Sequence, residues 1–148
     1  MEDAQIVELY WRRSEAAVPE TQAKFGPYCR TIAYNILSDE QDAEECVNDT
    51  WLGAWNSMPQ NRPRLLAPYL AKLTRWLSLT RLRERNALRR FLAGLDETEA
   101  QVFLARCWYM AGVKEIAEKF GFTPGKVSTM LHRTRGKLQD YLREEGLC

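Results

Sequence analysis

Apolar residues recur at helical spacing along almost the whole chain, and strand-like alternation is nearly absent. This spacing predicts a first helix over residues 6–13 and a second over residues 25–36. The dipeptide Gly26-Pro27 is expected to start or kink the second helix, because proline cannot donate a backbone hydrogen bond. The pattern therefore predicts an all-α protein.

Two more helices are predicted on either side of a proline-rich loop. Ser38 and Asp39 are candidate N-caps of the third helix, and Gln41 follows Ser38 at the capping-box distance. The third helix should run to about Met58 and bury Ala43, Cys46, Val47, Thr50, Trp51, Ala54, Trp55 and Met58. A fourth helix should begin near Leu65 and turn inward Leu66, Leu70, Leu73, Leu77 and Thr80.

The pattern becomes irregular from Asn86 to Gly94, which predicts a short linker between two small helical domains. We expect domains over 1–86 and 95–148, with the linker at 87–94. If residues 86–95 were extended, these ten residues would span at most ~35 Å. In the second half, helices are expected over 96–110, 113–120 and 123–145.

The junction between the last two helices is typical of a helix-turn-helix. Gly121 suits the left-handed residue that ends a helix, Thr123 an N-cap, and Pro124 the first helical position. Phe122 and Val127 stand at the hydrophobic-staple positions. The following helix should bury Val127, Leu131, Thr134, Leu138 and Leu142.

The outer face of this last helix has the chemistry of a DNA-reading surface. It carries no acid from Gly125 to Gln139, and arginine can read guanine edges while hydroxyls and cations bind bases or phosphates. Its candidate DNA-binding residues are Lys126, Ser128, Thr129, His132, Arg133, Arg135 and Lys137. Lys126 could offer a phosphate contact at the helix N-terminus or extend into water, and His132 could be a solvated surface residue.

Charge is unevenly distributed although the net charge is +1. Residues 1–60 hold 4 Lys+Arg and 11 Asp+Glu, residues 61–90 hold 9 and 1, and residues 91–148 hold 8 and 8. The division indicates either two kinds of partner surface or acidic and basic blocks that neutralise each other within one fold.

Several classes of protein are not supported by the sequence. No apolar run approaches the ~20 residues of a membrane span, and the acidic start is unlike a signal peptide, so we expect a cytoplasmic protein. Cys29, Cys46, Cys107 and Cys148 lack CxxC spacing and are expected to be reduced thiols without a metal. No nucleophile–base pair or phosphate-binding glycine loop is found, and the one histidine leaves few options for acid–base catalysis. We expect neither enzymatic activity nor a cofactor.

Two segments together resemble the extracytoplasmic-function (ECF) group of bacterial RNA polymerase sigma factors. DAEECVNDTWLGAWNSMP, residues 42–59, resembles region 2.2, and EIAEKFGFTPGKVSTMLHRTRGKL, residues 115–138, resembles region 4. The resemblance implies that Glu45, Asn48 and Asp49 bind the clamp coiled coil of the polymerase β′ subunit. Without the resemblance, these three residues would be interpreted as a solvated acidic face.

Residues 65–90 resemble regions 2.3 and 2.4, which hold and help open the minus-10 promoter element. The implied DNA-binding residues are Tyr69, Lys72, Arg75, Trp76, Arg81, Arg83 and Arg85. Trp76 could equally be a platform for unstacked bases or part of the core. The sequence departs from the family pattern in three places. Trp76 and Thr80 stand where relatives commonly have Asn and Asp, and Ser128 and Met130 replace residues that are often basic. The linker is also shorter than in relatives.

The resemblance predicts a two-domain sigma factor that is monomeric when free and takes no small-molecule substrate. Its implied partners are core RNA polymerase, through the β′ clamp coiled coil and the β flap, promoter DNA and an anti-sigma factor. One alternative is a helix-turn-helix repressor or activator with an acidic N-terminal dimerisation or sensing domain. Another is an all-helical interaction module without a DNA function.

Overall fold

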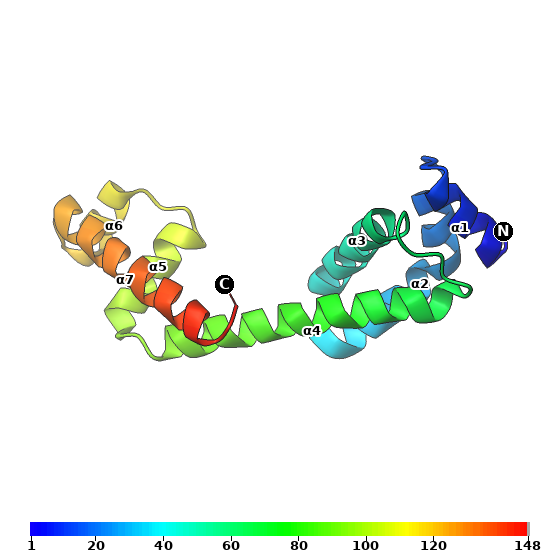
Figure 1. Ribbon diagram of the computed structural model, residues 1–148. Coiled ribbons are helices and arrows are strands. Elements are labelled where there is room, and N and C mark those ends of the chain that lie inside the picture. Colours follow the sequence, from blue (N-terminus) through cyan, green and yellow to red (C-terminus); the bar gives the residue numbers. More distant parts are fainter. Residues whose placement is uncertain (148) are drawn as a thin grey trace. The chain divides into compact units, whose positions relative to one another are not determined.

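The computed structural model describes residues 1–147 and contains seven helices and no strand over that range (Figure 1). The helices are α1 (Asp3–Trp11), α2 (Ala17–Leu37), α3 (Glu40–Ser57), α4 (Leu66–Ala93), α5 (Glu97–Cys107), α6 (Val113–Phe120) and α7 (Pro124–Glu144). The chain divides into two compact units, Met1–Arg83 and Glu84–Cys148, and α4 passes through the boundary. The predicted all-α class is confirmed.

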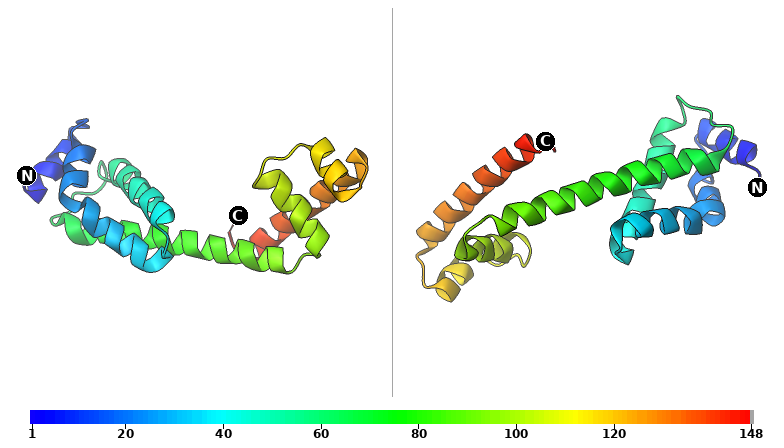
Figure 2. Two further views of the ribbon diagram at one scale, coloured as in Figure 1. Left: turned by 180° about the vertical axis from the view of Figure 1, so that it is seen from behind. Right: turned by 90° about the horizontal axis from the view of Figure 1, so that it is seen from below.

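The first unit is built on α1 to α3 and the first part of α4. α2 and α3 pack along each other (Figure 2), and the predicted inner face of α3 is confirmed, since seven of its eight residues are buried and Trp55 packs against the core. Leu66 and Leu70 bring α4 into the same core. The hydroxyls of Thr50 and Thr74, 3.0 Å apart, join α3 to α4 inside it.

Two expectations about where helices begin are wrong, namely that Gly26-Pro27 starts α2 and that Ser38 caps α3. Residues 26 and 27 neither start nor end α2: the helix begins at Ala17 and includes Pro27. Proline removes only one helical hydrogen bond, and burial of one helix face, including Phe25 and Cys29, offsets that loss. Ser38 is not an N-cap but a left-handed residue, φ 54°, that ends α2. Asp39 caps α3 instead, and its carboxylate accepts the Asp42 N–H at 2.8 Å.

The segment expected to be an irregular linker is largely helical. α4 continues to Ala93 because Ala87 and Phe91, one turn apart, are both buried. Only Gly94 to Asp96 separate α4 from α5. The extended reach expected for residues 86–95 therefore does not apply.

The second unit contains the predicted helix-turn-helix. α6 has the predicted bounds, Gly121 ends it with φ 71°, and the Thr123 hydroxyl accepts the Lys126 N–H at 3.2 Å. The core of the unit consists of Val102, Phe103, Ile116, Ala117, Val127 and Leu131. Local cap chemistry thus fixes where α6 ends and where α7 begins.

Cys29, Cys46 and Cys107 are free thiols, and Cys148 lies outside the described residues. Within residues 1–147, no cluster of histidine, cysteine and acidic side chains could hold a metal ion. None of the helices over the same range is long and apolar enough to cross a membrane.

Candidate functional site

The acidic residues predicted on the third helix lie on the outer side of α3. Asn48 and Asp49 are exposed, and the Glu45 side chain is 46% exposed, while the neighbouring Cys46 and Thr50 are buried. The helical period that buries one set of residues turns the other set outward. α3 therefore presents carboxylates and an amide on one solvent-facing surface, which can accept bonds from cations of a partner.

Arg81 of α4 reaches this acidic surface within the first unit. Its guanidinium donates a hydrogen bond to Glu45 Oε2 and lies 3.5 Å from Asp42 Oδ1. Burial lowers the pKa of Arg81, but the adjoining carboxylates, Glu45 foremost, outweigh that effect and the pKa is raised overall. A residue assigned to DNA by resemblance is thus bound to a residue assigned to polymerase.

The outer face of α4 carries three of the other cations that the sequence assigned to the minus-10 element. Lys72, Arg75 and Arg83 are exposed, and Trp76 and Leu79 among them are 65% and 54% exposed. Trp76 is therefore not part of the core, because its ring lies on the surface. Large apolar side chains surrounded by cations form a surface on which unstacked bases can rest.

Besides Arg81, two more of the predicted minus-10 residues lie apart from this exposed face. Tyr69 packs against the core of the first unit, and its hydroxyl is hydrogen-bonded to that of Ser57. Arg85 is half-buried and belongs to the second unit. The structure therefore groups Lys72, Arg75, Trp76 and Arg83 on one face and leaves Tyr69, Arg81 and Arg85 outside that group.

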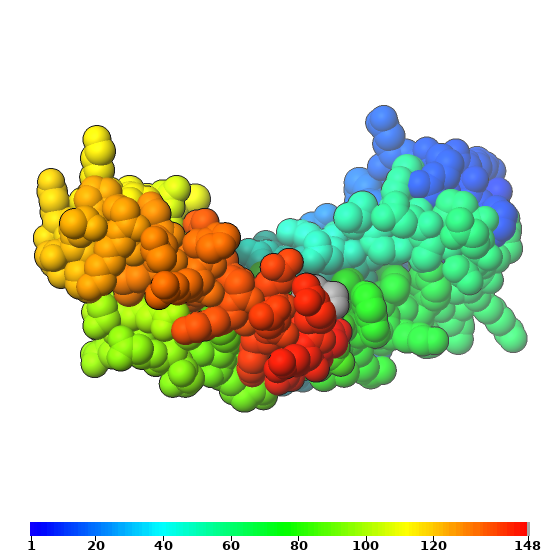
Figure 3. Space-filling model, turned by 60° about the vertical axis from the view of Figure 1, so that its left-hand side comes forward, coloured from blue at the N-terminus to red at the C-terminus, as the bar shows by residue number. Residues whose placement is uncertain are grey.

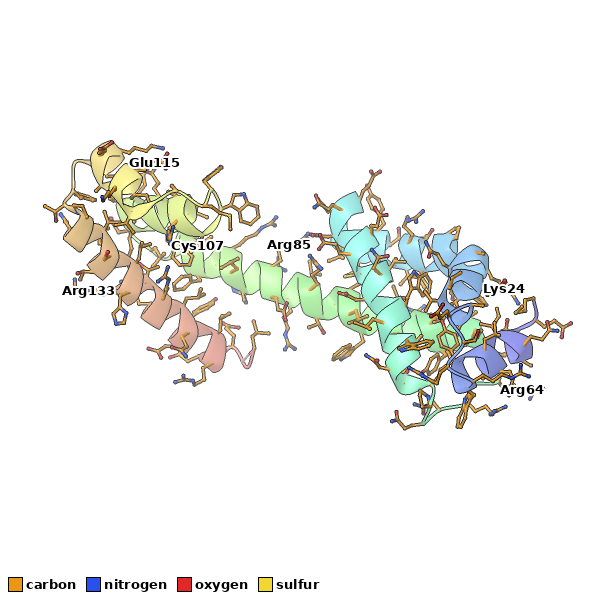
Figure 4. All side chains as sticks on the ribbon, turned by 90° about the horizontal axis from the view of Figure 1, so that it is seen from above. Lys24, Arg64, Arg85, Cys107, Glu115 and Arg133 are labelled. Atoms are coloured by element: carbon orange, nitrogen blue, oxygen red, sulfur yellow. The ribbon has the colours of Figure 1, made fainter. Side chains whose placement is uncertain are left out.

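The outer face of α7 is exposed along its length, as expected. All seven predicted DNA-binding residues on it are exposed, and α7 side chains form a continuous part of the visible surface (Figure 3). Arg133 lies on the side of α7 that faces away from α5 and α6 (Figure 4). A Cβ added at Gly125 or Gly136 would meet no atom within 4 Å, so the two glycines leave this face open to close approach.

Two lysines on this face already have partners. Lys126 Nζ lies 4.1 Å from the centre of the Phe122 ring, a cation–π contact that helps to hold a cation near a helix N-terminus. Lys137 Nζ lies 3.0 Å from Glu99 Oε1, which also accepts the Thr134 hydroxyl at 2.8 Å. These hydrogen bonds, that from Lys137 first, lower the pKa of Glu99.

The loop between α5 and α6 carries apolar side chains that sequence reasoning assigned to a helix. α5 ends at Cys107 and not at Met110, and Trp108, Tyr109 and Met110 are 73%, 77% and 82% exposed. Met110 has φ 55°, in the left-handed region that α-helical residues do not adopt. Three consecutive large apolar residues cannot share one helix face, and that spacing is the signal that could have revealed the loop.

Comparisons with known proteins divide the chain close to the boundary between the two compact units. Residues 23–88 match the family model for sigma-70 region 2, and residues 85–138 match the model for sigma-70 region 4. A solved structure of CnrH in complex with the cytosolic domain of CnrY is similar over 96% of this chain and 97% of that chain, with 20% identity and a TM-score of 0.48. The comparison with curated proteins found no match.

Proposed function

Because this chain belongs to the sigma-70 family of bacterial RNA polymerase sigma factors, we propose which of its surfaces contact polymerase and which contact the promoter. Regions 2 and 4 follow each other in the order that the ECF resemblance predicted, so the sequence-based expectation of a sigma factor is confirmed. Members of this family direct RNA polymerase to promoters. The acidic surface of α3, with Glu45, Asn48 and Asp49, docks on the β′ clamp coiled coil.

One observation carries this assignment: the acidic face and the acid-free DNA-reading face belong to different units. The former lies in the segment that matches region 2 and the latter in the segment that matches region 4. An acidic surface repels the phosphate backbone and favours cationic protein partners, whereas a cationic surface favours DNA. Such separation suits a protein that binds an enzyme and its template at the same time.

The exposed face of α4 serves the minus-10 element in this proposal. Lys72, Arg75 and Arg83 hold the strand backbone, and Trp76 gives an unstacked base a surface. The outer face of α7 reads the minus-35 element, with Arg133 and Arg135 as the long donors and the small residues allowing close approach.

The further partners rest on the resemblance alone. They are the polymerase β flap and an anti-sigma factor, and the free chain is expected to be a cytoplasmic monomer without catalytic activity. The rival helix-turn-helix repressor would leave the match to region 2 without a role. It would also bind duplex DNA well without polymerase.

The direct test is co-elution of the purified chain with bacterial core RNA polymerase on a sizing column. We expect the wild-type chain to co-elute and the double variant Glu45→Lys, Asp49→Lys to be lost from the complex, because two contacts become repulsions. Helix content by circular dichroism should be the same for both.

The matched control is Asp140→Lys, Glu144→Lys, which places the same charge change at the same i, i+4 spacing on the exposed face of α7. This variant should still co-elute. Retention of Glu45→Lys, Asp49→Lys in the complex would remove α3 as the docking surface. A wild-type chain that ignores polymerase would contradict the proposed function.

A further inference from the structure

Arg81 differs from Arg75 and Arg83 of the same helix because two carboxylates already bind it. Glu45 accepts its hydrogen bond, and Asp42, one turn earlier on α3, lies 3.5 Å away. Arg81 is 34% exposed and Asp42 25%, so water screens these charges less than it would on an open surface. Arg75 and Arg83 on the same helix are exposed.

We propose that Arg81 is a positioning residue of the polymerase-docking surface, which holds the Glu45 carboxylate in place for a cation of the polymerase, and that Arg81 is not a DNA contact. This inference rests on the proposed function, since it deepens the role of Glu45. It also reassigns Arg81 from the minus-10 group in which the resemblance placed it.

Arg81 is poorly available to DNA. A phosphate would have to displace two carboxylates that the fold holds within contact distance, and these carboxylates act at a far higher effective concentration than a strand arriving from solution. Such an exchange replaces one set of charge-assisted bonds by another and gains little binding free energy. A phosphate could bind the exposed Arg75 or Arg83 without displacing Glu45 or Asp42.

Glu45 remains available to a partner while Arg81 holds it. Arg81 engages Oε2, no bond to Oε1 is found within residues 1–147, and the side chain is 46% exposed. A free glutamate on a helix surface has several rotatable bonds, and ordering it on binding costs entropy. Arg81 removes part of that cost in advance and leaves the other carboxylate oxygen of Glu45 available to a partner.

Buried neighbours on both helices also fix the contact between Arg81 and Glu45. Cys46, next to Glu45, and Ser78, one turn before Arg81, are both buried where α3 meets α4. The two charged side chains therefore project from the closed edge of a packed interface. This fixes the backbone positions from which they meet and makes the pairing a property of the fold.

The test compares Arg81→Ala, Glu45→Gln and the double variant in two measurements. The first is affinity for core polymerase; the second is the salt dependence of promoter binding by the assembled holoenzyme. We expect Arg81→Ala to weaken polymerase binding about three- to tenfold, and to cause no further loss when Glu45 is already Gln, because contacting residues couple. The salt slope of promoter binding should not change.

Arg83→Ala is the matched control, since it removes a cation from the same helix. It should leave polymerase affinity unchanged and reduce the salt slope by about 0.7 to 0.9 for one lost phosphate contact. Arg81→Lys keeps the charge without the planar fork and should restore part of the polymerase affinity, which shows that the loss is not misfolding.

The outcomes separate the inference from the proposed function. If Arg81→Ala lowers the salt slope as Arg83→Ala does, or if its effect on polymerase affinity adds fully to that of Glu45→Gln, Arg81 does not act through Glu45 and the inference is overturned. The proposed function survives both results. A wild-type chain without affinity for polymerase would overturn the proposed function itself.

Discussion

At the scale of single residues, the cations that we assign to DNA differ in the partners that they already have. Lys137 is bound by Glu99, and Lys126 lies over Phe122, whereas no such contact was expected from the sequence. Helical periodicity predicts which side chains face outward, because it depends on neighbours within a few residues. It cannot predict the partner of Lys137, because Glu99 lies on another helix and 38 positions away.

Glu99 makes a pH-dependent contribution to stability. Its pKa is lowered in the folded state, by Lys137 and then by Thr134, so its carboxylate stabilises the fold above the ordinary glutamate pKa of about 4.3. The stabilisation should decline as pH falls below that value and vanish below the lowered pKa. The measurement is the free energy of unfolding against pH for the wild type and for Glu99→Gln.

The difference between these two proteins should be largest near neutral pH and shrink in acid. Glu118→Gln, at an exposed position of α6, controls for the loss of one negative charge. A difference for Glu99→Gln that stays the same down to pH 3 would mean that the contact with Lys137 does not shift the carboxyl titration.

At the scale of helices, local chemistry predicted some boundaries and missed others. The start of α7 and the end of α6 follow from Thr123, Pro124 and Gly121, whose preferences act within one turn. The start of α2 and the extent of α4 were missed. Tertiary burial keeps α2 helical through Pro27 and extends α4 to Ala93. Capping residues therefore predict a helix boundary well only where tertiary packing does not move that boundary.

Gly136 gives a prediction about α7 as a whole. It lies in the helix interior, is exposed, and has no atom within 4 Å of an added Cβ. Gly136→Ala should therefore stabilise the protein by about 0.5–1 kcal/mol, since glycine costs more backbone entropy than alanine. If α7 lies in the major groove, the added methyl group should also weaken promoter binding.

Thermal unfolding and promoter affinity of the holoenzyme measure the two effects on one variant. Higher stability with lower affinity supports close approach of DNA to α7, because loss of folding is excluded as the cause. Higher stability with unchanged affinity would argue that DNA does not approach this part of the helix.

At the scale of the whole molecule, the sequence predicted the fold class, the helix-turn-helix and the family, and missed how charges are shared within each unit. The two charge blocks, residues 1–60 and 61–90, were interpreted either as partner surfaces or as mutually neutralising. Both hold in part: Arg81 pairs with Glu45 and Asp42, while Arg75, Arg83 and Asp49 remain exposed. Composition alone cannot separate these cases, since the division depends on where α3 meets α4.

The most direct measurement is transcription by bacterial core RNA polymerase on a library of bacterial genomic fragments, with and without this chain. Our account predicts chain-dependent transcripts that start at discrete sites and share sequence elements near positions −35 and −10, with the chain alone binding duplex DNA weakly. The account would be contradicted if the chain initiated no transcripts and bound duplex DNA tightly without polymerase.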